Sequence, residues 1–475
     1  MSRLGLPPAY AVRARALIDR LFRGSPDGVI PVARRRVATA AGAVLLGLVA
    51  LLFARLGDHL QSLHGAIVHR WPYLPLVLTP LIFAGTAWIT MRFFSAARGS
   101  GIPQVIAAAH NPEASSRGPL ISLKTATAKF WLTLAMLFAG GSVGREGPTV
   151  QISAAIMIAV HRLLRVPVTA GVYIAGGAAG VSAAFNTPLA GVAFAIEELA
   201  AAYEQRVAVL VMAAVMIAGF VSLGIAGDYV YFGAMRQTLA LGPALIVIPV
   251  IGICGGLAGG LFSRSVLAFG RSQHPALAAL RARPVRLALG CGVIVAVIGI
   301  ATGISWGTGY GTTRHLVEGD GAPPWFGPAK LGATLATTLS GTPGGIFAPS
   351  LSVGAGIGNL LSPLFTAPSA VVVVLGMAAY FVGVVRAPLT AVIIITETTA
   401  SRGLVIPLFA TALIADTAGA LVCRERLYHG LSRPFLQRRR VPPDPDASER
   451  EEPMDRGHRR RPGDDVERQA HLHEV

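Results

Sequence analysis

GREGP at residues 144–148 places one carboxylate, Glu146, between two glycines at a predicted helix start, and GGIFAP at 344–349 is its counterpart in the second half of the chain. A second pair of motifs keeps the same order. GSGIP at 99–103 precedes the first break, and GTG at 307–309 precedes the second. Corresponding Gly/Pro-broken segments in two halves of a hydrophobic chain are typical of transporters, which bind their substrate between the repeats. The pattern therefore predicts an ion pathway between two halves.

The composition is that of a membrane protein. Hydrophobic residues make up 53% of the 475 residues and charged residues 14%, with 55 glycines and a mean hydropathy of +0.59. Because a soluble domain carries about 25% charged residues, lipid-facing surface is the simplest explanation of the missing charge. Cys254, Cys291 and Cys423 show no paired spacing, so neither a disulfide framework nor a metal site is expected, and no cofactor is implied.

The net charge of +17 comes largely from arginines beside the first and last apolar runs, such as Arg34–Arg36 and Arg424. Arginine in these places is retained in the cytoplasm, so both termini are expected there, with an even number of full crossings. Nucleic acid is not an expected partner, because these arginines lack interleaved aromatic residues.

Eleven apolar runs predict an all-α polytopic membrane protein. Many are shorter than the roughly 20 residues that a membrane-crossing helix needs, or contain Gly and Pro, so tilted, broken and re-entrant helices are expected. The runs are 37–55, 75–94, 120–141, 149–163, 171–198, 205–226, 240–268, 286–304, 328–341, 349–385 and 388–423. The predicted domains are a basic cytoplasmic segment at 1–34, which could lie on the membrane as an amphipathic helix, repeats at 35–226 and 227–432, and a disordered charged cytoplasmic tail at 433–475.

The Gly-rich breaks suit an anion. Glycine removes the Cβ that would keep a ligand from the backbone, and the first turn of a helix leaves N–H groups without intrahelical partners. Together with the positive end of the helix dipole, the amides near Gly101, Ile102 and Gly147 favour a halide, and Ser100 adds a hydroxyl donor. The alternative, that each break only permits a kink or close packing, is disfavoured by the ordered recurrence.

Two interpretations of Glu146 stay open on local sequence. An ionisable group at membrane depth costs roughly 2.5 to 3.5 kcal/mol, so a functional reason is expected. The carboxylate could occupy the anion's place and leave when protonated or displaced, which would couple anion movement to proton movement. Alternatively, Glu146 complements the helix dipole or pairs with Arg145.

In this order the motifs resemble the signature of the CLC chloride channel and transporter family over residues 35–432. The resemblance implies a homodimer with one anion pathway in each subunit and two repeats of inverted topology. It also implies that the anion is held by Ser100, Tyr428 and the backbone amides of Ile346 and Phe347, and that Glu146 is the external gate. The supporting motif residues are Gly99, Pro103, Gly144, Arg145 and Pro148.

Glu198 matches the second glutamate of the family's exchangers, which gives protons an internal entrance, with Glu197 beside it. Exchange of chloride for protons is therefore expected; the alternative is a passive voltage- or pH-gated chloride channel of the same fold. From the residues alone, Glu197 and Glu198 could equally be an interfacial acidic pair. Gln104 and Ile106 stand where similar bacterial exchangers tend to be acidic, which predicts weaker or rerouted proton coupling.

Lys129 and Lys330 stand at the same spacing before Glu146 and Phe347, where each could raise the potential of the pathway or snorkel to an interface. Glu397 echoes Glu197 and is expected to be structural. By resemblance, Ser100 favours chloride, the bacterial inner membrane is the expected location, and no cytoplasmic nucleotide-binding pair is expected. Enzymatic activity is not expected, because the interior histidines lack i, i+4 pairing and no Gly-x-Ser-x-Gly or His-Glu-x-x-His motif occurs.

Overall fold

The computed structural model describes residues 29–116, 118–199, 205–227 and 230–437, and these ranges are helical apart from their connections. Most of the predicted basic segment and of the predicted charged tail therefore lies outside the described residues. Helix α2 already begins at Val29, inside the expected basic segment, and α20 extends to Gln437, beyond the predicted start of the tail.

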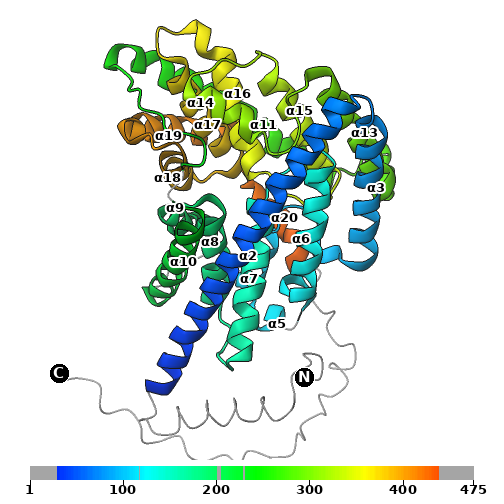
Figure 1. Cartoon of the computed structure of the whole chain (residues 1–475), viewed down its shortest axis with the longest axis vertical. Coiled ribbons are helices and arrows are strands. Elements are labelled where there is room, and N and C mark those ends of the chain that lie inside the picture. Colours follow the sequence, from blue (N-terminus) through cyan, green and yellow to red (C-terminus); the bar gives the residue numbers. More distant parts are fainter. Residues whose placement is uncertain (1–28, 117, 200–204, 228–229, 438–475) are drawn as a thin grey trace, which may run out of the picture. The chain divides into compact units, whose positions relative to one another are not determined.

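The helices of the first half are α2 (Val29–Arg70), α3 (Pro75–Phe93), α4 (Ile102–His110), α5 (Pro112–Ser116), α6 (Leu123–Phe138), α7 (Glu146–Leu163), α8 (Ala170–Phe185), α9 (Pro188–Phe194), the π-helical turn η3 (Ala195–Leu199) and α10 (Gln205–Ala226). Those of the second half are α11 (Leu241–Arg271), α12 (Pro275–Arg281), α13 (Pro284–Thr302), α14 (Tyr310–Glu318), α15 (Phe326–Leu339), α16 (Phe347–Leu361), α17 (Ser369–Val385), α18 (Pro388–Thr399), α19 (Val405–Val422) and α20 (Leu427–Gln437). Figure 1 shows their arrangement.

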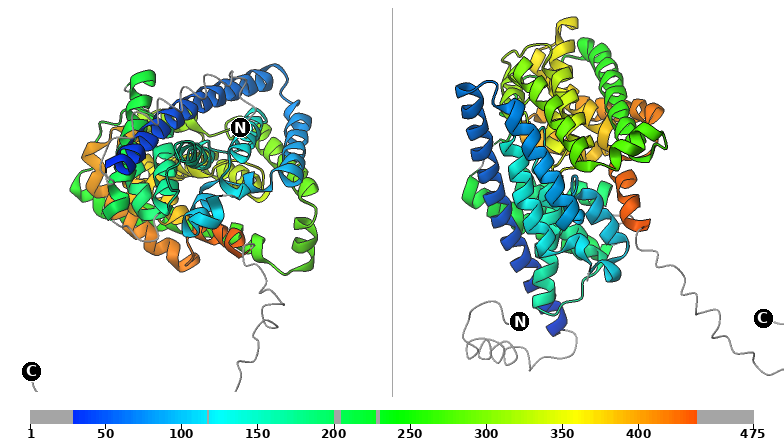
Figure 2. Two further views of the ribbon diagram at one scale, coloured as in Figure 1. Left: turned by 90° about the horizontal axis from the view of Figure 1, so that it is seen from below. Right: turned by 90° about the vertical axis from the view of Figure 1, so that its right-hand side faces the viewer.

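Six of the described helices are long and apolar enough to cross a membrane; they belong to α2, α3, α10, α11, α13 and α19. The expected run 37–55 is only the middle of α2, which has 42 residues. A helix of that length spans about 60 Å, twice the hydrocarbon thickness, so α2 must tilt or project from the bilayer. It lies along α6, α7, α8 and α10 (Figures 1 and 2).

Three of the expected runs are each two helices in the structure. The run 171–198 breaks after α8, where Asn186 adopts φ 58° and Pro188 starts α9. The run 388–423 breaks in the same manner at Ala400, φ 51°, and 349–385 breaks between α16 and α17 ahead of Ser369. The predicted runs passed over these breaks because the polar residues at each break are few and the flanking segments are apolar, whereas a left-handed residue or a proline is enough to end a helix.

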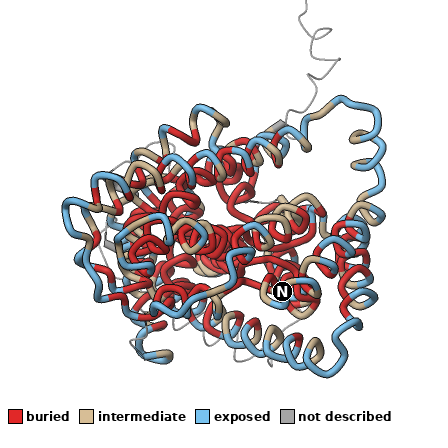
Figure 3. The backbone as a smooth tube through the Cα atoms, turned by 90° about the horizontal axis from the view of Figure 1, so that it is seen from above, coloured by how far each residue is buried: buried red, intermediate tan, exposed pale blue. Residues whose placement is uncertain are grey.

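Glycines allow α11 to approach its neighbours at backbone distance. A Cβ on Gly256 would lie 2.5 Å from the carbonyl oxygen of Ala415 in α19, and one on Gly259 would lie 2.5 Å from that of Tyr380 in α17. Buried residues accordingly gather in the interior, with exposed residues around them (Figure 3). Helices α11, α17 and α19 thus pack as one group within the compact unit that ends at Arg433.

Gly259→Ala is expected to destabilise the protein by about 1–3 kcal/mol, the usual cost of overpacking a tight contact, because α11 and α17 would have to move apart. The measurement is the midpoint of thermal unfolding of the purified protein in detergent. Gly270→Ala in the same helix is the control, since a Cβ there meets nothing within 4 Å. Equal midpoints for the two variants would contradict this account of the packing.

Candidate functional site

The glycine-rich breaks of the two halves meet through their backbones. Gly144 N–H donates to the carbonyl of Gly345 at 2.7 Å, and Gly345 N–H donates to that of Gly144 at 2.8 Å, which makes an isolated antiparallel bridge. The neighbouring Gly344 N–H donates to the carbonyl of Gly99 at 3.1 Å. Three of the four motifs that the sequence singles out, GREGP, GGIFAP and GSGIP, are therefore joined at one place.

Three helices begin at this junction: α4 at Ile102, α7 at Glu146 and α16 at Phe347. Gly101 precedes α4 with φ 110°, a conformation that a side chain would strain. Pro103, Pro148 and Pro349 lie in the first turns, where the missing N–H of proline removes no intrahelical bond. The junction thus presents three sets of first-turn amides, which suit an anion.

Ser100 and Tyr428 add two hydroxyl groups. Both residues are buried, and neither Ser100 Oγ nor Tyr428 OH completes a hydrogen bond with a protein group, although the two lie near each other. Ser100 also packs against Gly147, because a Cβ on that glycine would collide with Ser100 Oγ. Because these two hydroxyls lie at the junction of the first-turn amides, they are available to a hydrogen-bond acceptor such as an anion.

Glu146 is 1% exposed and faces the first turn of α16. Its Oε2 accepts a long hydrogen bond of 3.4 Å from Ala348 N–H, and its Oε1 has no partner. The sequence left open that Glu146 pairs with Arg145. The structure excludes this pairing. The Arg145 guanidinium donates instead to Asp58 and to the carbonyl of Ala54, both at 2.7 Å.

The adjacent acids Glu197 and Glu198 have different surroundings. Glu197 caps α18, where its carboxylate accepts from Leu389 N–H at 3.1 Å and Thr390 N–H at 2.7 Å. Glu198 lies in the π-helical turn, its side chain is 0% exposed, and neither of its oxygens makes an aligned hydrogen bond. The interfacial acidic pair suggested by the residues alone is therefore wrong.

Glu397 mirrors Glu197. Its carboxylate accepts from Leu189 N–H at 3.3 Å and from Ala190 N–H at 2.8 Å, in the first turn of α9. Each half of the chain thus supplies a carboxylate that caps a helix of the other half. Exchanged contacts of this kind are what an approximate twofold relation between the halves produces.

Lys129 and Lys330 also form a matched pair, and both are fully buried, so the snorkelling alternative is wrong. Lys129 Nζ donates to the carbonyls of Ala97 at 2.8 Å and Gly99 at 2.5 Å. Lys330 Nζ donates to those of Ser305 at 3.0 Å and Gly307 at 2.5 Å. The amino group of each lysine therefore holds, through hydrogen bonds, the loop that leads into its Gly-x-Gly motif.

Gln104 has a structural role that the sequence did not reveal. Its side-chain amide donates to the carbonyls of Arg98 at 2.6 Å and Ala96 at 3.2 Å, in the loop that Lys129 also holds. An ionised acid at this position would have no proton to donate to either carbonyl. Ile106, the other departure from the expected acids, is 1% exposed and packs in the interior.

His429 is a residue that the sequence analysis did not identify. It directly follows Tyr428, and its Nδ1 lies 3.3 Å from Glu198 Oε1. Sequence motifs do not predict this contact, because it joins α20 to a π-helical turn from the other half of the chain.

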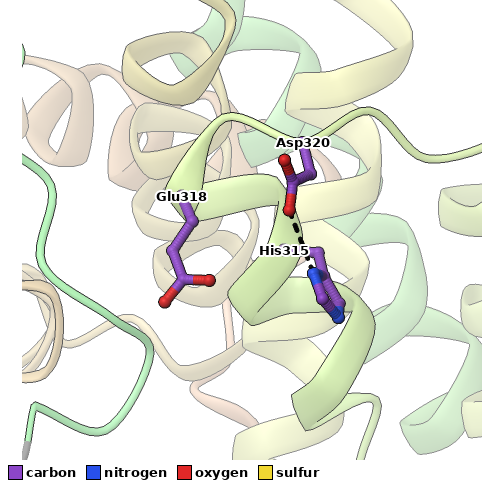
Figure 4. Close-up of side chains that lie close together, drawn as sticks. All are labelled: His315, Glu318 and Asp320. Carbon is purple, nitrogen blue, oxygen red and sulfur yellow. Dashed lines mark hydrogen bonds and ion pairs between the residues drawn. The ribbon is translucent and has the colours of Figure 1, made fainter.

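A group of exposed side chains, His315, Glu318 and Asp320, brings its ligand atoms within 4.8 Å of one another (Figure 4). His315 Nδ1 lies 3.1 Å from Asp320 Oδ2, and Glu318 is paired with Arg314 at 2.9 Å. Both carboxylates already have partners, so the group is explained as a surface ion-pair cluster at the end of α14.

The chain matches the family model described as voltage gated chloride channel over residues 81–419. It belongs to this family, the CLC family. Its activity is accordingly anion transport rather than enzymatic catalysis, and it is a multi-pass membrane protein of the CLC fold.

Three solved structures share the fold. A slow cyanobacterial Cl⁻/H⁺ antiporter matches with a TM-score of 0.72 and 22% identity, covering 86% of this chain and 99% of its own. A CLC-type fluoride/proton antiporter matches with a TM-score of 0.70 and 22% identity, over 82% and 96%. A eukaryotic CLC transporter matches with a TM-score of 0.68 and 21% identity, over 85% and 74%.

Gln104→Leu is expected to destabilise the protein by about 1–3 kcal/mol, because buried carbonyls in the loop before Ser100 would lose donors. Thermal unfolding in detergent measures the effect. Thr127→Val is the control, since it removes an exposed hydroxyl that bonds only within its own helix. If Gln104→Leu unfolded at the wild-type temperature, Gln104 would not hold this loop.

Proposed function

We propose that this protein exchanges chloride for protons across the membrane. The observation that carries the proposal is a pair of buried carboxylates, Glu146 and Glu198, both within electrostatic reach of the Tyr428 hydroxyl. Ser100 and Tyr428 would hold the anion together with the first-turn amides of Gly101, Ile102, Gly147, Ile346 and Phe347. One carboxylate would then exchange protons with the outside and the other with the inside.

Coupling follows from the position of Glu146. Its carboxylate faces the same amides that an anion would use, so ion and carboxylate compete for them. Protonation removes the negative charge, weakens the contact with the first turn of α16 and frees the place for chloride. An anion that enters from one side therefore favours a proton moving in the opposite direction.

The outer route is supported by a cavity of about 260 Å³ beside Arg145. Arg55, Asp58, Tyr231 and Tyr310 contribute to its lining. Two guanidinium groups against one carboxylate give this cavity a net positive charge, which attracts anions. We propose it as the external mouth of the pathway, ahead of Glu146.

Chloride is the proposed physiological anion, because Ser100 offers a hydroxyl of the kind that goes with chloride in similar family members.

We also propose that the protein is a homodimer in the plasma membrane, with both termini in the cytoplasm. Exposed apolar side chains on α9 and α19, such as Leu189, Leu413 and Leu421, offer surface for lipid or for a second copy. Light scattering of the detergent-solubilised protein measures the subunit number.

Proteoliposomes test the exchange directly. A chloride gradient is imposed while valinomycin and potassium clamp the voltage, and proton uptake is followed, with a protonophore as control. Uphill proton movement that follows chloride supports exchange. Chloride efflux without proton movement would make the protein a passive channel, the alternative that the replacement of acids by Gln104 and Ile106 favours.

Glu146→Ala is expected to abolish chloride-driven proton movement while chloride flux persists, because the competing carboxylate is gone but the amides and hydroxyls remain. The same vesicle assay measures both fluxes. Glu318→Ala removes an exposed acid paired with Arg314 and serves as control. Proton movement that survived unchanged in Glu146→Ala would refute the role of Glu146.

Glu198→Gln is expected to lower proton flux at least tenfold and to leave the protein permeable to chloride, because glutamine keeps the shape of the side chain but cannot carry a proton. Glu318→Gln is the matched control. Unaltered coupling in Glu198→Gln would show that protons enter by another route.

A further inference from the structure

Glu198 has no direct access to water, since its side chain is 0% exposed. Among the described residues, the other positions that the sequence indicated for the inner entrance do not pass a proton to it. Glu197 accepts two backbone N–H groups of α18, and Gln104 and Ile106 do not titrate. If Glu198 loads protons from the inside, as proposed above, a further group must connect it to water.

His429 has the geometry of that connection. Its Nδ1 is buried and lies 3.3 Å from Glu198 Oε1, while the side chain as a whole is 37% exposed. Nδ1 makes no aligned hydrogen bond with another protein group, so this nitrogen is available to Glu198. The imidazole therefore reaches from solvent to the buried carboxylate, a distance that Glu198 cannot cover alone.

We propose that His429 relays protons between water on the inner side and Glu198. This inference rests on the proposed exchange. The imidazolium gives its Nδ1 proton to the Glu198 carboxylate, which leaves a neutral ring that carries its proton on Nε2. Rotation of the neutral ring then brings the vacant Nδ1 to water, where it regains a proton, and a second rotation returns Nδ1 to Glu198. The reverse steps carry a proton outward. Only protons move in this relay, and no other reactant is needed.

Several charged groups lie around the His429 ring. The Glu198 carboxylate is the acid closest to the ring, and Arg426, three residues earlier in the chain, donates from Nη1 to the Glu197 carbonyl at 3.1 Å. Glu425 also faces His429. A hydrogen bond from Arg271 lowers the pKa of Glu425 below its usual range, so this acid stays ionised at neutral pH.

Glu425 is held by a second cation, Arg433, at 3.0 Å. The surroundings of His429 are therefore one buried carboxylate at close range and, beyond it, the Arg426 guanidinium and a cluster in which two arginines share the Glu425 carboxylate. This arrangement leaves Glu198 as the main proton acceptor for the ring.

His429→Gln tests the relay in the vesicle assay. We expect proton flux to fall about tenfold and its dependence on inner pH between about 5 and 8, where histidines titrate, to flatten. His274→Gln is the control, because His274 is an exposed histidine shortly after Arg271 in the chain. Chloride flux of His429→Gln in the Glu146→Ala background checks that the pathway is still folded.

A second variant keeps the test decisive. His429→Ala opens space beside Glu198, and imidazole added on the inner side is expected to restore part of the proton flux, which a purely structural role would not allow. Wild-type proton flux and pH dependence in His429→Gln would overturn the relay while the exchange stands. Absence of proton movement in the wild type would overturn the exchange itself, and the relay with it.

Discussion

The bridge between Gly144 and Gly345 is the constraint on which the site depends. Backbone groups at membrane depth must be satisfied within the protein, and here two broken segments satisfy each other. The exchange of hydrogen bonds brings the starts of α7 and α16 together. A side chain would crowd this approach: a Cβ on Gly345 would lie 3.0 Å from both Gly144 O and Gly147 N, so the neighbouring backbone would have to shift. Glycine at these positions therefore favours the convergence of the first-turn amides.

Matched contacts hold the two halves in this arrangement. Lys129 and Lys330 fasten equivalent loops, and Glu197 and Glu397 cap equivalent helices across the interface between the halves. A buried ammonium is costly to desolvate, so each lysine is retained only because several carbonyls surround it. The scaffold is thus symmetric in its supporting interactions, which act on backbone rather than on the ion.

The site itself departs from this symmetry. Glu146 starts α7, whereas Phe347 starts α16. In the first half, Ser100 Oγ has no protein partner. At the equivalent Gly-x-Gly motif of the second half, Gln61 Oε1 accepts from the Thr308 amide at 2.9 Å and from its hydroxyl at 3.2 Å. In the second half, the Gln61 side chain therefore occupies the donors of Thr308, whereas in the first half the hydroxyl of Ser100 remains available. This difference explains why only one of the two equivalent Gly-x-Gly motifs has a hydroxyl without a protein partner, although both halves supply first-turn amides.

The sequence by itself determined that the chain is a helical membrane protein with two Gly/Pro-broken halves, because hydropathy, helix breaking and first-turn donors are local properties. The motifs were sufficient to identify Ser100, Glu146 and Glu198 as candidates. Only the tertiary structure decided which partner each charged group has: Arg145 pairs with Asp58, Glu197 with α18, and Glu198 with His429. These partners come from segments distant in the chain, and their distances depend on how the helices pack. The same packing decided where the long apolar runs divide into separate helices, since one left-handed residue such as Asn186 ends a helix although the segments on both sides of it remain apolar.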